Sequence, residues 1–121
     1  MESSTILAIA IAVLVALGVL VLFTNLRRRD VHAVSRETAL EMAAGALARS
    51  HSGIALSVTG IAGPDGGSAE KPVGLVWFGV AMIGRPAVAE KRQFENRGRD
   101  FVRRQTVITA LELGLAALAE A

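Results

Sequence analysis

An uninterrupted apolar run near the N-terminus limits the folds open to this chain more than any other feature. From Ile6 to Phe23 the 18 residues ILAIAIAVLVALGVLVLF contain no polar side chain. At the helical rise, a helix of this length spans about 27 Å, close to the hydrocarbon thickness of a bilayer. A buried core helix fits less well, because a helix that is apolar all round needs a large protein about it. The run therefore predicts a single membrane-spanning helix.

Charges beside this run predict its orientation. Arg27, Arg28 and Arg29 follow it, whereas Glu2 is the one charged residue before it. By the positive-inside rule, the C-terminal side stays in the cytoplasm. A cleaved signal peptide would show the opposite order, with a basic start and small residues at a cleavage site. We expect a single-pass protein of the cytoplasmic membrane, anchored through residues 6–23, with its soluble part in the cytoplasm.

The rest of the chain has almost no net charge. Of 13 basic and 11 acidic residues, the first 30 residues hold three and two, which leaves ten basic and nine acidic. A net charge so close to zero does not indicate nucleic-acid binding. The three arginines are explained instead as an anchor at the membrane surface. The absence of cysteine excludes disulfides and thiol catalysis. His32 and His51 are isolated, so we expect no metal and no cofactor.

Two regular patterns follow the basic triplet. Residues 34–49 carry apolar side chains at helical spacing, with Ser35 as a plausible N-cap and Glu37 in the first turn, and predict a helix. Residues 54–59 alternate between large and small side chains and predict a strand with two unlike faces. The large side chains are Ile54, Leu56 and Val58, and the small ones are Ala55, Ser57 and Thr59.

Three further elements complete the pattern. Residues 73–82, VGLVWFGVAM, are apolar on both faces and predict a central strand covered on both sides, with Trp77 in the core. Residues 87–94 follow Pro86 and mix charged with apolar side chains, which predicts a more exposed hairpin partner. A last helix is expected from about residue 100 to 118.

The fold class that results is α/β. The elements form an incomplete α/β layer in the order helix, strand, glycine loop, strand, strand, helix, preceded by a single transmembrane-type helix. Two helices are too few to cover such a sheet in the usual layered arrangement. We therefore expect part of the fold to be missing.

A glycine-rich loop joins the first two strands. The stretch TGIAGPDGGSAEKP, from residue 59 to 72, needs either a tight turn or a ligand that approaches the backbone, because glycine is costly to order. Successive N–H groups in such a turn can bind phosphate or carboxylate. Neither a Walker A loop nor GxGxxG is present. An ordinary connection, with Pro64 and Asp65 as turn residues, stays open as the alternative. The loop glycines are Gly60, Gly63, Gly66 and Gly67.

Two arginines extend the hypothesis of an anion site. Arg103 and Arg104 are expected in the first turn of the last helix, where the helix dipole disfavours a cation by about 0.3–1 kcal/mol. A bound anion would reverse that effect, whereas two solvated arginines would tolerate it. Arg103 is preferred because the small residues Thr106 and Ala110 follow on its side, and Lys71 is a further candidate. The candidate ligand-binding residues are Thr59, Gly60, Gly63, Gly66, Gly67 and Arg103.

These segments resemble a known family. TGIAGPDGG, followed by EKPVG and a Trp-Phe strand, and RDFVRRQTVITALEL at the last helix are similar to the C-terminal domain of the CinA (competence-damage inducible) family. The resemblance covers about residues 31–121. It implies nicotinamide mononucleotide amidohydrolase activity, in which the carboxamide nitrogen leaves as ammonia, and a nucleotide phosphate as ligand.

The resemblance also implies a missing part. The family domain begins with a Glu-Ser-Cys-Thr-Gly-Gly motif, whose serine is thought to be the nucleophile, then a Thr-Tyr-Ser-Asn segment and a nearby lysine, and none of these occurs here. We divide the chain into a transmembrane helix with its basic flank, 1–30, and a partial domain, 31–121. The expected function is a truncated amidohydrolase-like domain with no catalytic residue, inactive alone, and paired with its own copy or a complementing chain. The alternative is a membrane-anchored, non-catalytic interaction module or a remnant of a rearranged gene.

Overall fold

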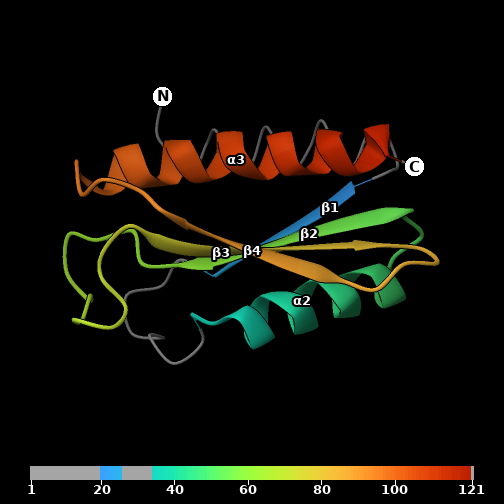
Figure 1. The fold of residues 1–121 in the computed structure, drawn as a ribbon, viewed down its shortest axis with the longest axis horizontal. Coiled ribbons are helices and arrows are strands. Elements are labelled where there is room, and N and C mark those ends of the chain that lie inside the picture. The colour runs from blue at the N-terminus through green and yellow to red at the C-terminus, as the bar shows by residue number, and fades with distance from the viewer. Residues whose placement is uncertain (1–19, 26–33, 121) are drawn as a thin grey trace.

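The described part of the chain forms a four-stranded sheet with a helix on each face (Figure 1). The computed structural model describes residues 20–25 and 34–120. The sheet order is β1-β2-β3-β4, in which β1 runs parallel to β2 and the other neighbours are antiparallel. The elements are β1 (Leu20–Asn25), α2 (Arg36–Arg49), β2 (Ile54–Gly60), β3 (Leu75–Met82), β4 (Val88–Gln93) and α3 (Arg99–Ala119).

The end of the apolar run is a strand. Leu20–Asn25 pairs in parallel with residues 54–59, so the expected helix over residues 6–23 is wrong for its last four residues. A continuous apolar run suits a buried parallel strand as well as a membrane helix, and here the edge of β2 supplies backbone partners. Residues 6–19, and the predicted span and orientation that depend on them, lie outside the described residues. Among the described residues, no helix has the length and apolar content needed to cross a bilayer.

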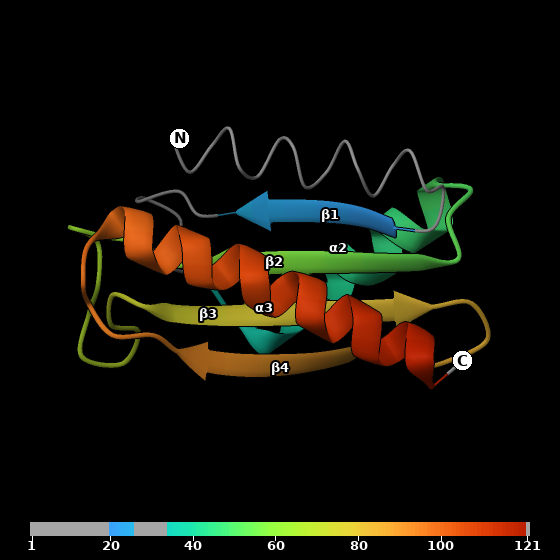
Figure 2. The same ribbon diagram turned by 90° about the horizontal axis from the view of Figure 1, so that it is seen from above.

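Each face of the central strands has its own helix. Figures 1 and 2 show α2 on one side of the sheet and α3 crossing β2 and β3 on the other. The strand expected over residues 73–82 begins two residues later, as β3, and all of it except Trp77 and Met82 is buried. The expectation that two helices are too few is therefore wrong for this strand, because they lie on opposite faces and not side by side.

The large-residue face of β2 forms the main core beneath α3. Ile54, Leu56 and Val58 are fully buried and pack with Val102 and Ala110 of that helix. Complete burial of one such aliphatic side chain contributes roughly 1.5–3 kcal/mol. This contact holds α3 on the sheet and confirms the predicted alternation of β2.

The small-residue face of β2 lets α2 approach closely. The Ser57 hydroxyl donates a hydrogen bond of 2.6 Å to the carbonyl oxygen of Ala39. Gly79 of β3 lies opposite Ser57, and a methyl group on it would overlap the same carbonyl. The helix therefore packs through its backbone as much as through its side chains. The Ser57 hydroxyl therefore serves this contact between helix and sheet.

The expected hairpin partner is β4, at the edge of the sheet. It pairs with β3 and is exposed at every residue except the half-buried Ala89. Glu90 and Arg92, two residues apart on one face, form an ion pair of 2.8 Å. Charged side chains on an edge strand oppose pairing with other sheets.

Candidate functional site

The glycine-rich loop leaves β2 and folds back on itself before β3. At its base, the Ile61 N–H donates to the Leu75 carbonyl at 3.0 Å, and the Gly74 N–H donates to the Ile61 carbonyl at 2.7 Å. Near its tip, the Ser68 N–H donates to the Lys71 carbonyl at 2.9 Å, and the Lys71 N–H donates to the Ser68 hydroxyl at 3.0 Å. These bonds make the loop a compact unit and not a slack connection.

Its glycines are required by this compact packing. A methyl group on Gly60 would lie 2.9 Å from a backbone oxygen of β3, and one on Gly67 would lie 2.7 Å from the Val73 nitrogen. Gly63, with φ of 83°, would bring a methyl group to 2.7 Å from a Val73 methyl. Gly66 has φ of 101°, a region that favours glycine. The glycine content therefore follows from the tight turn, and needs no ligand to explain it.

A side chain that the sequence did not single out joins this loop to α3. Arg99, the first residue of α3, is half-buried and donates from Nη1 to the Gly63 carbonyl oxygen at 2.8 Å. Hydrogen bonds from a charged donor are among the stronger ones in proteins. Gly98, which has a φ of 100° in the structure, precedes the helix and could have marked Arg99 as its first residue. No sequence signal points from Arg99 to Gly63.

The two arginines predicted in the first turn lie further along α3. Arg103 and Arg104 are its fifth and sixth residues, so the expected position is wrong. Because the dipole effect fades within the first turn, it disfavours neither of them. Arg103 is half-buried and Arg104 exposed, and Thr106 and Ala110, on the Arg103 side, are buried. Arg103 thus lies on the more sheltered side of the helix.

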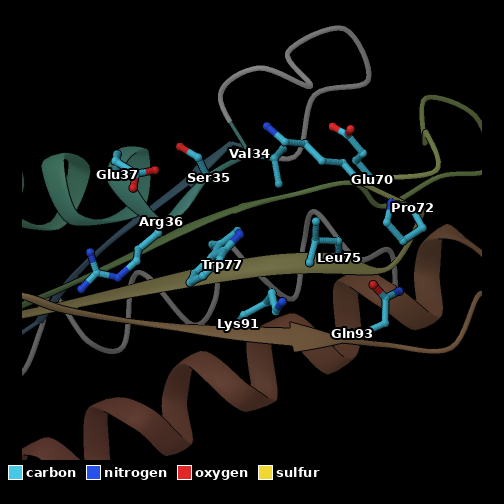
Figure 3. A pocket seen from close by; sticks show the side chains of 11 residues that line it. Val34, Ser35, Arg36, Glu37, Glu70, Pro72, Leu75, Trp77, Lys91 and Gln93 are labelled. Atoms are coloured by element: carbon cyan, nitrogen blue, oxygen red, sulfur yellow. The ribbon is translucent and has the colours of Figure 1, made fainter.

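A depression of about 480 Å³ lies between the start of α2, the returning arm of the loop and the sheet (Figure 3). Trp77, expected in the core, is half-buried there and packs on Val34, Ile61 and Leu75. The ammonium group of Lys91 lies 5.9 Å from the centroid of its ring system. The charged residues that line this depression are Arg36, Glu37, Glu70, Lys71 and Lys91.

The predicted ligand-binding residues do not all meet in one place. Gly66 and Gly67 line a second, more open depression of about 650 Å³ at the loop tip, which Asn96 also lines. Thr59 and Gly60 are buried at the end of β2. Arg103 lines neither of these two depressions. The depression at the loop tip is thus lined largely by loop residues with small side chains, whereas most of the charged side chains line the depression in Figure 3.

Two buried hydroxyls hold the fold and not a substrate. Ser57 donates to Ala39 as described, and the Thr106 hydroxyl donates to the Val102 carbonyl at 2.7 Å. Across residues 20–25 and 34–120, no group of three histidine, aspartate or glutamate side chains is placed to hold a metal ion. His51 is exposed.

These residues form a small α/β domain whose glycine loop is hydrogen-bonded to the first residue of its last helix. The family description "CinA C-terminal domain" matches residues 24–118. The chain therefore belongs to the CinA C-terminal domain family, as the resemblance predicted.

Curated relatives carry the name of an enzyme. Nicotinamide-nucleotide amidohydrolase PncC of Enterobacter agglomerans is 48% identical over 83 residues, which cover 69% of this chain and 50% of that protein. The Pseudomonas putida protein of the same name is 50% identical over 83 residues, covering 69% and 51%. The chain thus spans about half the length of the curated relatives it matches.

Solved structures show the same fold. Competence/damage inducible protein CihA from Agrobacterium tumefaciens superposes with a TM-score of 0.74 at 29% identity, covering 96% of this chain and 95% of that one. A competence-damaged protein (CinA) superfamily protein from Escherichia coli gives 0.62 at 34% identity, covering 69% and 47%. The fold of this chain is thus shared with solved structures of CinA-type proteins.

Proposed function

We propose that this chain is the ligand-holding part of a nicotinamide-nucleotide amidohydrolase-like domain. It binds the phosphate of a mononucleotide through the glycine loop and Arg103, and it does not cleave the amide alone. The observation that carries the proposal is the bond from Arg99 to Gly63, which fixes the loop to the start of α3. Figure 2 shows the loop and this helix start at the same end of the sheet. Successive N–H groups of such a loop can bind an anion. The proposal adds the guanidinium of Arg103, the fifth residue of α3.

The reaction named for the relatives needs more than this part offers. Amide hydrolysis requires an activated nucleophile and donors for the oxyanion. The loop can supply N–H donors, but Ser57 and Thr106 use their hydroxyls on backbone carbonyls. The Glu-Ser-Cys-Thr-Gly-Gly motif of the family does not occur in the sequence. The proposal therefore assigns the nucleophile to another chain.

Titration calorimetry with nicotinamide mononucleotide tests the binding. Arg103→Ala should weaken binding by about 1.5–3 kcal/mol, or roughly tenfold to a hundredfold, the usual size for a hydrogen bond to a charged group. Arg104→Ala is the matched control, since it removes the same charge from the exposed side of α3, and should cost much less. Equal losses would show a net-charge effect, and no saturable binding by the unaltered chain would contradict the proposal.

An ammonia-release assay with the same nucleotide tests the lack of catalysis. The purified chain should release no more ammonia than a heat-denatured sample, even at nucleotide concentrations that saturate binding. Turnover that the unaltered chain shows and Arg103→Ala loses would mean that the chain holds its own nucleophile. That result would contradict the proposed lack of catalysis, whereas the proposed binding of the nucleotide could still be correct.

A further inference from the structure

The side of α3 that faces away from the sheet carries five side chains in one straight stripe. Steps of three, four, four and three residues keep them on one side of a helix with 3.6 residues per turn. Two of them are large apolar residues with exposed side chains, Ile108 at 43% and Leu115 at 68%. The stripe consists of Phe101, Arg104, Ile108, Glu112 and Leu115.

The opposite side of α3 accounts for its contact with the sheet. Val102, Thr106, Ala110 and Gly114 are buried there. Figure 1 shows α3 as the layer above the sheet, and Figure 2 shows it lying obliquely across the strands. The stripe is therefore not needed to hold α3 on β2 and β3.

The stripe is self-complementary about Ile108. Four residues before it stands Arg104 and four residues after it Glu112, while Phe101 and Leu115 stand seven residues away on either side. If an antiparallel copy is related by a two-fold axis through Ile108, Arg104 faces Glu112 of the second copy, and this pair occurs twice. Phe101, which is half-buried with the Arg97 guanidinium 4.6 Å from its ring centroid, then faces Leu115 of the second copy, also twice. The two Ile108 side chains meet on the axis. An isologous two-fold contact requires such an order of residues.

We propose that this face of α3 is the contact surface for a second copy of the chain, packed as an antiparallel helix pair centred on Ile108. The charge order favours this occupant over a lipid surface, because a membrane-bound helix places basic residues, and not Glu112, beside its apolar side chains. A foreign helix would not require charges of opposite sign at equal distances from the centre. The proposal does not depend on the nucleotide site.

The size of the stripe sets the expected strength. From residue 101 to 115 it is about 21 Å long at the helical rise. One helix pair buries less than the roughly 1,600 Å² of a standard interface, so the dimer should dissociate in the micromolar range. The apolar side chains supply most of the contact, and the two ion pairs set the antiparallel direction and the register.

Sedimentation velocity of the full chain, from low to high micromolar concentration, tests the pairing through charge reversal. Arg104→Glu should weaken the dimer by about tenfold or more, because it sets glutamates against each other at two places, and Glu112→Arg should do the same with arginines. The two substitutions combined should restore the dissociation constant of the unaltered chain. In one helix these residues are eight positions, about 12 Å, apart, so this restoration requires a second chain.

Glu41→Arg is the matched control. Glu41 is exposed on α2, on the other side of the sheet, so the same change of charge should leave the dimer as it was. Circular dichroism checks that each variant is folded. Any of three results overturns the proposal: an unaltered chain that is monomeric throughout, folded single variants that dimerise normally, or a folded double variant that stays monomeric.

Discussion

The two faces of the sheet hold their helices by different means. Beneath α3, long aliphatic side chains such as Leu56 fill the space between helix and strand. Beneath α2, Gly79 and Ser57 let the Ala39 carbonyl reach the sheet. Side chains alternate between the two faces of a strand. The residues of β2 and β3 therefore set both the distance of α3 from the sheet and the distance of α2 from it. The large-residue face should therefore be sensitive to lost volume and the small-residue face to added volume.

The largest effect is expected when volume is removed beneath α3. Leu56→Ala should lower the free energy of unfolding by about 2–5 kcal/mol, because it deletes a fully buried side chain and leaves a cavity. Urea denaturation followed by circular dichroism measures it. A loss below about 1 kcal/mol would mean that α3 collapses onto the sheet and that this face is not rigidly packed.

A smaller but still clear effect is expected when volume is added beneath α2. Gly79→Ala should cost about 1–3 kcal/mol, since the new methyl group meets a backbone carbonyl and the Ser57 hydroxyl, and neither can move freely. The same denaturation experiment measures the change. An unchanged stability would show that α2 can shift outward, which would remove the distinction between the two faces.

The smallest effect is expected from the same substitution beneath α3. In Gly114→Ala, the new methyl group would lie 3.0 Å from a terminal carbon of Leu56, so a small shift of that side chain, and not of a backbone carbonyl, is enough to admit it. Alanine also favours a helix over glycine by about 1 kcal/mol. The two effects should nearly cancel, so the stability should change by less than about 1 kcal/mol. If Gly114→Ala costs as much as Gly79→Ala, the comparison of the two faces fails.

Local sequence patterns predicted most of the helices and strands, because side-chain periodicity and capping depend on residues that are close in sequence. The alternation of Ile54, Leu56 and Val58 with small residues already described the two faces of β2, and the Ser35 cap of α2 is present, with its hydroxyl accepting from the Thr38 N–H at 3.1 Å. The glycine motif led to the correct family. The division of the chain at residue 30, the membrane location and the ligand-binding residues stay predictions.

The failures concern partners that are distant in sequence. The run that ends at Phe23 was assigned wholly to a helix, because an apolar run carries no period that separates a helix from a buried strand. Arg99 was overlooked because its partner, Gly63, is 36 residues away, and nothing in either neighbourhood refers to the other. The expected position of Arg103 and Arg104 in the first turn, where the helix dipole disfavours a cation, had drawn attention to them instead.

The sequence by itself determined the type of each element from residue 34 onward, since periodicity and capping are local properties. It left open whether the glycine loop is a tight turn or a ligand site. Only the tertiary structure decided that residues 20–25 pair with β2, that the helices take opposite faces, and that Arg99 fastens the loop to α3. A backbone must satisfy its hydrogen bonds either within its own segment or across a neighbouring strand. Which of the two prevails depends on whether a strand edge is available, and that is known only once the sheet is assembled.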